Sequence, residues 1–243
     1  MPPTVVRTED THTTTRPTPP AAVVLPTQRS APPREHAPSR EHAPSRDQSP
    51  TDRLTRRALG ALRTTTGRVL VTGRTGTPAA VSERLTAVDE TLATRAWCVD
   101  VYQLARQVLD ERRIEICTDT EKIEHAWVSA WERVGTHSVL HALGEEARWR
   151  AEIVGAIKGR GLTRFSQYRS DGTLMASAVW DLYVAYSEEL TTRFTHDLED
   201  LIAIALDELT SSPTRPRFDT VVIDPTVPLT PVMVRMLKAV VAR

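Results

Sequence analysis

Apolar residues recur every three or four positions between residues 79 and 210, which is the period of an amphipathic α-helix. The first of these patterns runs from about residue 78 to 112 and has two apolar stripes, so this helix is expected to pack at the centre of the core. Later patterns cover about 118–134, 136–158, 173–190 and 195–209. The chain is therefore predicted to be all-α, with a single helical-bundle core.

The two ends of the chain differ from this core in composition. Residues 1–55 are rich in Pro, Thr and Arg and contain the repeat Arg-Glu-His-Ala-Pro-Ser at 34–39 and 40–45. They have too few large apolar side chains to offset the entropy of ordering, which predicts a disordered N-terminal arm.

Residues 56–78 are expected to form a linker or turn, and 79–210 the helical core. Residues 211–243 are predicted to be an extended C-terminal tail, either lying on the core or reserved for a partner. This tail holds one possible strand, Phe218–Asp224, and one strand cannot form a sheet alone.

Charge is unevenly distributed although the totals, 31 basic and 31 acidic residues, cancel. Residues 1–78 hold 12 Arg and 6 acidic residues, so the remainder of the chain holds 19 and 25. A basic arm on an acidic body is typical of proteins that bind nucleic acid or each other. Cys98 and Cys117 have no CxxC spacing, which indicates free thiols in a reducing, intracellular compartment. The apolar runs are only a few residues long, so no membrane partner is expected.

A glycine turn lies within Arg-Val-Leu-Val-Thr-Gly-Arg-Thr-Gly-Thr-Pro-Ala, residues 68–79. This stretch resembles the strand, turn and helix that open a Rossmann unit of the short-chain dehydrogenase type, in which backbone N–H groups hold a pyrophosphate. Only Gly73 and Gly76 match, and no second strand is expected after the helix. A plain turn, with Thr77 as the helix N-cap and Pro78 at the first position, explains the same residues. Phosphate binding at this turn, and a nucleotide-binding enzyme, stay open as alternatives.

His137, His141 and Glu145 are spaced i, i+4, i+8 and would share one helix face. Such a set can ligate zinc, but it is not an HExxH motif and no second cluster supplies a fourth ligand. Metal binding is therefore not expected, although it stays open. Since neither GxSxG nor a Cys–His motif is present, we expect no catalytic nucleophile, no cofactor and no enzyme activity.

The densest mixture of cationic and aromatic side chains lies between residues 159 and 194. Guanidinium groups pair with phosphates, and aromatic faces stack on unpaired bases. The residues assigned to nucleic-acid binding are Arg160, Arg164, Phe165, Tyr168, Arg169 and Arg193. The alternative is that the arginines offset the acidic body while the two rings anchor a loop to the core. In the next helix, Asp197 and Asp200 could pair with a nearby Arg.

Three short motifs follow one another in this region: Arg164-Phe165-x-x-Tyr168, Val179-Trp180-Asp181 and Thr192-Arg193-Phe194. In this order they resemble, over about 40 of the 243 residues, the central region of flexuous filamentous plant-virus coat proteins such as those of potexviruses and carlaviruses. The family's second Phe after the Arg-Phe pair is missing here. The resemblance implies a helical core with flexible arms that join subunits, and arginines lining a groove for single-stranded RNA.

The arginines and aromatic rings predict binding to single-stranded nucleic acid. The resemblance implies a structural, coat-like protein that assembles with itself on single-stranded RNA as part of a virion. A helical protein-interaction or regulatory module without nucleic acid is the alternative.

Overall fold

The computed structural model describes residues 49–144, 146–168, 173–211 and 217–241, and most of these residues are helical. The elements in chain order are α1 (Pro50–Thr64), β1 (Val69–Thr72), α2 (Thr77–Val88), α3 (Glu90–Ala93), β2 (Ala96–Cys98), α4 (Val101–Glu111), α5 (Thr120–Ala130), η1 (Trp131–Gly135), α6 (Val139–Ala142), α7 (Glu146–Glu152), η2 (Ile153–Ile157), η3 (Lys158–Arg160), α8 (Phe165–Tyr168), α9 (Leu174–Thr192), α10 (Leu198–Ser211), β3 (Thr220–Ile223) and α11 (Pro231–Ala239). η1 and η2 are π-helical turns, and η3 is a turn of 3-10 helix. Most of the predicted arm, residues 1–48, lies outside the described residues.

Three short strands form a parallel sheet in the order β2-β1-β3. Val69 at the start of β1 pairs with Ala96 of β2 on one side and Thr220 of β3 on the other. Every residue of β1 is buried, as expected for a central parallel strand covered on both faces. The prediction of an all-α fold is therefore wrong, although the chain is mostly helical.

The helix predicted from residue 78 to 112 is divided into α2, α3 and α4, with β2 between α3 and α4. Asp89 and Asp100 start new helices, because their carboxylates accept hydrogen bonds from the Leu92 and Gln103 N–H groups. β2 is only three residues long, too short to show an alternating pattern inside a helical periodicity.

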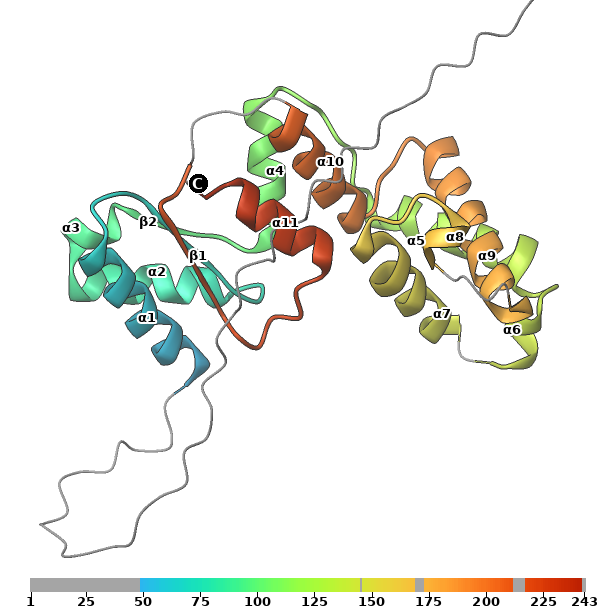
Figure 1. Ribbon diagram of the computed structural model, residues 1–243, viewed down its shortest axis with the longest axis horizontal. Coiled ribbons are helices and arrows are strands. Elements are labelled where there is room, and N and C mark those ends of the chain that lie inside the picture. Colours follow the sequence, from blue (N-terminus) through green and yellow to red (C-terminus); the bar gives the residue numbers. More distant parts are fainter. Residues whose placement is uncertain (1–48, 145, 169–172, 212–216, 242–243) are drawn as a thin grey trace, which may run out of the picture. The chain divides into compact units, whose positions relative to one another are not determined.

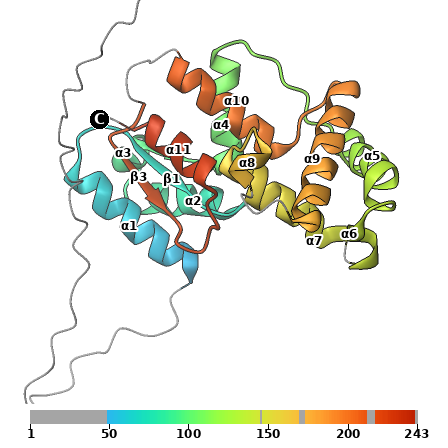
Figure 2. The same ribbon diagram turned by 45° about the vertical axis from the view of Figure 1, so that its right-hand side comes forward.

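Helices cover both faces of the sheet (Figures 1 and 2). Val69 and Val71 of β1 belong to one apolar cluster with side chains of α1 and α2. Leu70 points to the other face and belongs to a second cluster with α4, α10 and α11. The segment 56–78, expected as a linker, thus contains most of α1 and the central strand.

A third apolar cluster holds the helices from α5 to α9 together. Its largest members are aromatic: the Trp127 ring meets the Tyr186 ring edge-on, with centroids 5.5 Å apart. The pattern at 118–134 corresponds to α5 followed by η1. The pattern at 136–158 is divided into α6, α7, η2 and η3. α9 and α10 lie where the patterns at 173–190 and 195–209 predicted helices.

The C-terminal segment is part of the core. β3 pairs with β1 along its whole length, and α11 buries Val232, Met233, Met236 and Leu237 against α4 and α10. The predicted extended tail is therefore not found among residues 217–241. Its strand has a sheet to join because the chain provides β1 and β2 far earlier in the sequence.

Candidate functional site

The glycine turn lies at the carboxyl end of the central strand and leads into α2. Gly76, the residue before the helix, has a φ of 85°, a left-handed conformation that favours glycine. The helix begins at Thr77, one residue earlier than expected, and Pro78 is its second residue. The strand, turn and helix expected of a Rossmann-like unit are therefore present. The parallel second strand, β2, is present as well, although the sequence did not predict it.

The backbone N–H groups of residues 73–76 donate to no partner in the described part of the chain. The first helical N–H, that of Thr77, instead donates to the Arg74 carbonyl at 2.9 Å. Consecutive open N–H groups before a helix N-terminus form a concave anion-binding surface. The crevice outside the carboxyl ends of parallel strands, where the strand order reverses, is also where α/β sheets bind ligands.

Each neighbouring strand is followed by a buried aspartate. Asp224 follows β3, and its Oδ1 accepts hydrogen bonds from the Thr226 N–H at 2.9 Å and hydroxyl at 2.8 Å. Asp100 follows β2 and accepts from the Gln103 N–H at 2.8 Å. Each carboxylate keeps acceptor positions beyond these bonds.

Cavities lie on both sides of the turn. One of about 220 Å³ is lined by Gly73, Arg74 and Thr75 together with Asp100. The other, of about 500 Å³, is lined by Gly76 and α2 on one side and by Gln103, Arg106 and Gln107 of α4 on the other. Arg74 donates to the Thr226 carbonyl at 3.1 Å, and Arg106 donates to the Thr118 hydroxyl at 2.5 Å. An exposed guanidinium group thus lines each cavity.

Two phosphate-binding motifs, the Rossmann fingerprint and the P-loop, are both incomplete at this turn. Only Gly73 and Gly76 match the Rossmann fingerprint. A P-loop that began at Gly73 would carry Gly, Lys and Ser or Thr at residues 78–80, where this chain has Pro, Ala and Ala. The lysine that reaches the β- and γ-phosphates and the hydroxyl that binds Mg²⁺ are therefore both missing. The arrangement can hold an anion, but it lacks the groups that promote phosphoryl transfer.

The described residues among those predicted to bind nucleic acid differ in exposure and in partners. Arg160, at the end of η3, and Arg164 are exposed, and their guanidinium groups have no described partner. Arg169 lies outside the described residues. Arg193 pairs with Glu189 and donates to the Ser129 hydroxyl at 2.8 Å. Arg193 also lies 13 residues beyond Trp180 along α9, which corresponds to about 20 Å.

The two predicted stacking rings are packed against Trp180. The Phe165 ring meets it edge-on at a centroid distance of 6.0 Å, and the Tyr168 ring stacks on it at 6.3 Å. Tyr168 is buried, and its hydroxyl donates to Glu152 Oε1 at 2.9 Å. These contacts are the ones expected of rings that anchor a loop to the core.

The histidine cluster is not on a single helix. α6 begins at Val139, so His137 precedes it and only His141 is helical. Glu145 lies outside the described residues. Among the described residues, no group of three or more His, Cys, Asp or Glu side chains has the geometry of a metal site.

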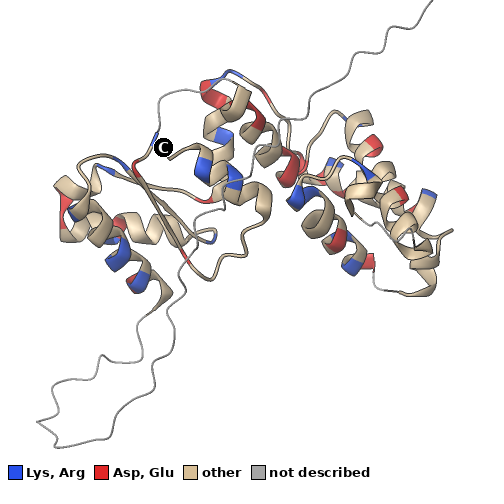
Figure 3. Cartoon of the chain, in the orientation of Figure 1, with Lys and Arg blue, Asp and Glu red and all other residues tan. Residues whose placement is uncertain are grey.

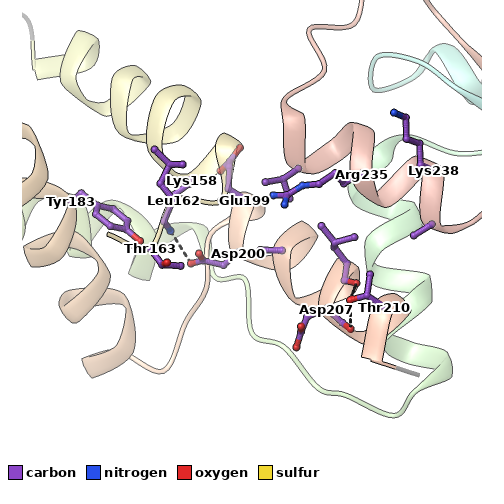
Figure 4. Close-up of a pocket in the computed structure, with 15 residues that line it drawn as sticks. Lys158, Leu162, Thr163, Tyr183, Glu199, Asp200, Asp207, Thr210, Arg235 and Lys238 are labelled. Carbon is purple, nitrogen blue, oxygen red and sulfur yellow. Dashed lines mark hydrogen bonds and ion pairs between the residues drawn. The ribbon is translucent and has the colours of Figure 1, made fainter. Parts of the chain in front are cut away.

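A larger cleft, of about 700 Å³, is lined by α10, α11 and the segment from Lys158 to Thr163 (Figure 4). Lys158 is buried at one end of it and donates to Asp197 and Asp200. The sequence suggested an Arg partner for these two acids, and the partner is this Lys. Burial raises the pKa of the Glu199 carboxyl, the charge of Asp197 raises it further, and a hydrogen bond from Tyr102 opposes the rise.

Comparison with protein-family models, curated proteins and solved structures finds no significant match to this chain. Among the described helices, none combines the length and the apolar character that crossing a bilayer requires.

Most residues around the glycine turn and in the cleft beside Lys158 were not predicted from the sequence. Asp100 and Asp224 each follow a short apolar run, which is the signal of a strand that ends at a polar edge. Arg235 and Lys238 are spaced i, i+3 on the last helix, opposite its buried methionines. Lys158 and Arg106 carry no comparable signal, because only the tertiary fold brings them to a cavity.

Proposed function

We propose that this protein binds a nucleotide through the glycine turn at residues 73–76 and does not hydrolyse it. The observation that supports this most is the row of open N–H groups at the carboxyl end of the central strand, between two cavities. The phosphates lie against these N–H groups and against the helix N-terminus. The nucleoside lies in the larger cavity, whose 500 Å³ falls within the usual range for small-molecule sites.

Arg74 and Arg106 supply the positive charge that a P-loop lysine would otherwise supply. Asp100, which lines the smaller cavity, is positioned to accept from a ribose hydroxyl or to share a Mg²⁺ ion with the phosphates. Because residues 78–80 provide neither lysine nor hydroxyl, the bound nucleotide is retained without phosphoryl transfer. The role that follows is binding, with the nucleotide as a structural or regulatory ligand.

The test is an equilibrium titration of the full chain with a fluorescent ATP analogue, followed by competition with ATP, ADP and NAD, each with and without Mg²⁺. Arg74→Gln and Arg106→Gln should each weaken binding about tenfold, because each removes a charge-assisted hydrogen bond. Arg63→Gln is the matched control, since Arg63 lies in the last turn of α1, which ends near the amino end of β1. Phosphate release should stay at the buffer rate.

The proposal fails if no compound saturates the protein at millimolar concentration, or if both variants bind as tightly as the control. Phosphate release that depends on the protein would contradict only the claim that the bound nucleotide is not hydrolysed.

Single-stranded nucleic-acid binding, the expectation from sequence, is a second candidate. The observation that favours it is that Arg160 and Arg164 are exposed and lack described partners. Fluorescence anisotropy with labelled oligouridine over a salt series tests it. If both arginines contact phosphates, Arg160→Gln/Arg164→Gln should reduce the slope of log K against log salt by about 1.4, since each contact contributes about 0.7.

The two candidates give opposite results with the same proteins. Arg160→Gln/Arg164→Gln should leave nucleotide binding unchanged, and Arg106→Gln should leave oligouridine binding unchanged. An oligouridine slope that matches wild type in the double variant would remove the nucleic-acid candidate.

A further inference from the structure

The 700 Å³ cleft beside Lys158 has opposite charges on its two sides. Arg235 and Lys238 of α11 lie on one side, and Asp207 of α10 lies on the other (Figure 4). Figure 3 shows the same division, with acidic positions along α10 and basic positions on α11. Between them the wall is apolar, formed by Ala203, Leu206, Val232 and Ala239.

The opposite charges do not neutralise each other. No ion pair in the described structure involves Asp207, Arg235 or Lys238. Lys158, by contrast, is already paired with Asp197 and Asp200 and is not available to a ligand. A ligand that carries both a cation and an anion would satisfy both sides of the cleft, whereas a polyanion would meet Glu199 and Asp207.

The lining of the cleft limits the length of the ligand. Arg235 donates to the Arg160 carbonyl at 3.3 Å, so it is held at the end of the cleft where Lys158 meets the first turn of α10. From Glu199 to Asp207 the α10 lining of the cleft spans eight residues, which is about 12 Å along the helix. An extended peptide of three residues covers about 10 Å between its ends.

We propose that this cleft binds a short peptide with free termini, such as a tripeptide. Its carboxylate pairs with the Arg235 guanidinium, its terminal ammonium pairs with the Asp207 carboxylate, and a central apolar side chain packs on Leu206 and Val232. Capture of terminal charges is an established mode of peptide recognition. The site is separate from the glycine turn, so the proposal does not rest on nucleotide binding.

Calorimetric titration of the full chain with the tripeptide Ala-Leu-Ala tests the proposal, together with its N-acetylated and C-amidated forms. Each capped peptide should bind wild type about tenfold more weakly than the free peptide, because each lacks one charge-assisted contact. In Asp207→Asn the free and acetylated peptides should bind equally. In Arg235→Gln the free and amidated peptides should bind equally.

Asp207 and Arg235 are exposed, so these variants are expected to fold. Glu83→Gln and Arg56→Gln, exposed positions on other helices, are the matched charge controls and should bind like wild type. The proposal is overturned if Ala-Leu-Ala does not bind at millimolar concentration, or if wild type does not distinguish free from capped peptides. It is also overturned if Arg235→Gln abolishes oligouridine binding while the peptide gives no heat, because the cleft would then hold nucleic acid.

Discussion

Lys158 Nζ donates to Asp197 Oδ2 at 2.5 Å, and both side chains are buried. A second bond, to Asp200 Oδ2 at 2.8 Å, joins the same ammonium group to the first turn of α10. Burial acts to lower the pKa of Lys158, but attraction to Asp197 and Asp200 outweighs it and the pKa is raised. The ammonium group therefore stays charged at neutral pH and links η3 to α10.

Replacing Lys158 by Met should destabilise the protein by about 3–5 kcal/mol, because Asp197 would be left buried without a counter-charge. Urea unfolding at pH 7 measures this loss. The double variant Lys158→Met/Asp197→Asn should recover part of it, since both members of the closest pair are then neutral. A double variant no more stable than Lys158→Met would show that the ion pair is not the cause.

The Glu199 carboxyl should make stability depend on pH in the direction opposite to a salt-bridged acid. Burial and Asp197 raise its folded-state pKa above the unfolded value, so folding favours the protonated form. Its contribution is fully present below pH 4.5 and is lost as the pH rises through the folded pKa.

Glu199→Gln should remove this loss, because the amide is neutral at every pH and can still accept from Tyr102. The variant should match wild type near pH 4 and exceed it at pH 7 in the free energy of unfolding. Urea titrations at pH 4, 5.5 and 7 provide the comparison. If the free energies of unfolding of variant and wild type differ by the same amount at all three pH values, Glu199 is not the source of the pH dependence.

Local patterns were enough to predict the helices that have strong caps and long apolar faces. α9 and α10 lie within a few residues of their predicted bounds. These signals are carried by neighbouring residues, so they survive in any tertiary context.

The sheet could not be predicted, because its pairings join distant segments. Val69 pairs with Thr220 across about 150 residues, and β2 is only three residues long. The same limit applies to the candidate sites. The turn at Gly73 and Gly76 could be recognised in the sequence. The pairing of β2 and β3 with β1, which places Asp100 and Asp224 at the same edge of the sheet as the turn, could not. In the sequence, Lys158 was only the last residue of a predicted helix. Its ion-pair partners, Asp197 and Asp200, come 39 and 42 residues later, so local patterns could not identify them.

The two cysteines should differ in reactivity. Burial raises the pKa of the Cys98 thiol to about 11, whereas Cys117 is exposed. A two-unit rise reduces the thiolate fraction at pH 8 about a hundredfold, and the thiolate is the reactive form. Titration with a thiol reagent should therefore label one cysteine quickly in the native protein and both in urea. Cys117→Ser should abolish the fast phase, and a fast phase that persists would refute the prediction.

Gly159 and Gly155 should respond in opposite ways to replacement by Ala, although they are four residues apart. A Cβ at Gly159 would lie 2.8 Å from Thr230 Cγ2 and 2.9 Å from the Val154 carbonyl oxygen, and the carbonyl cannot move without shifting the backbone. Gly159→Ala should therefore cost about 1–3 kcal/mol. A Cβ at Gly155 has no atom within 4 Å, so Gly155→Ala should stabilise by about 0.5–1 kcal/mol through helix propensity. Urea unfolding of both variants decides the matter, and an unchanged Gly159→Ala would show that α11 does not pack on η3 as closely as described.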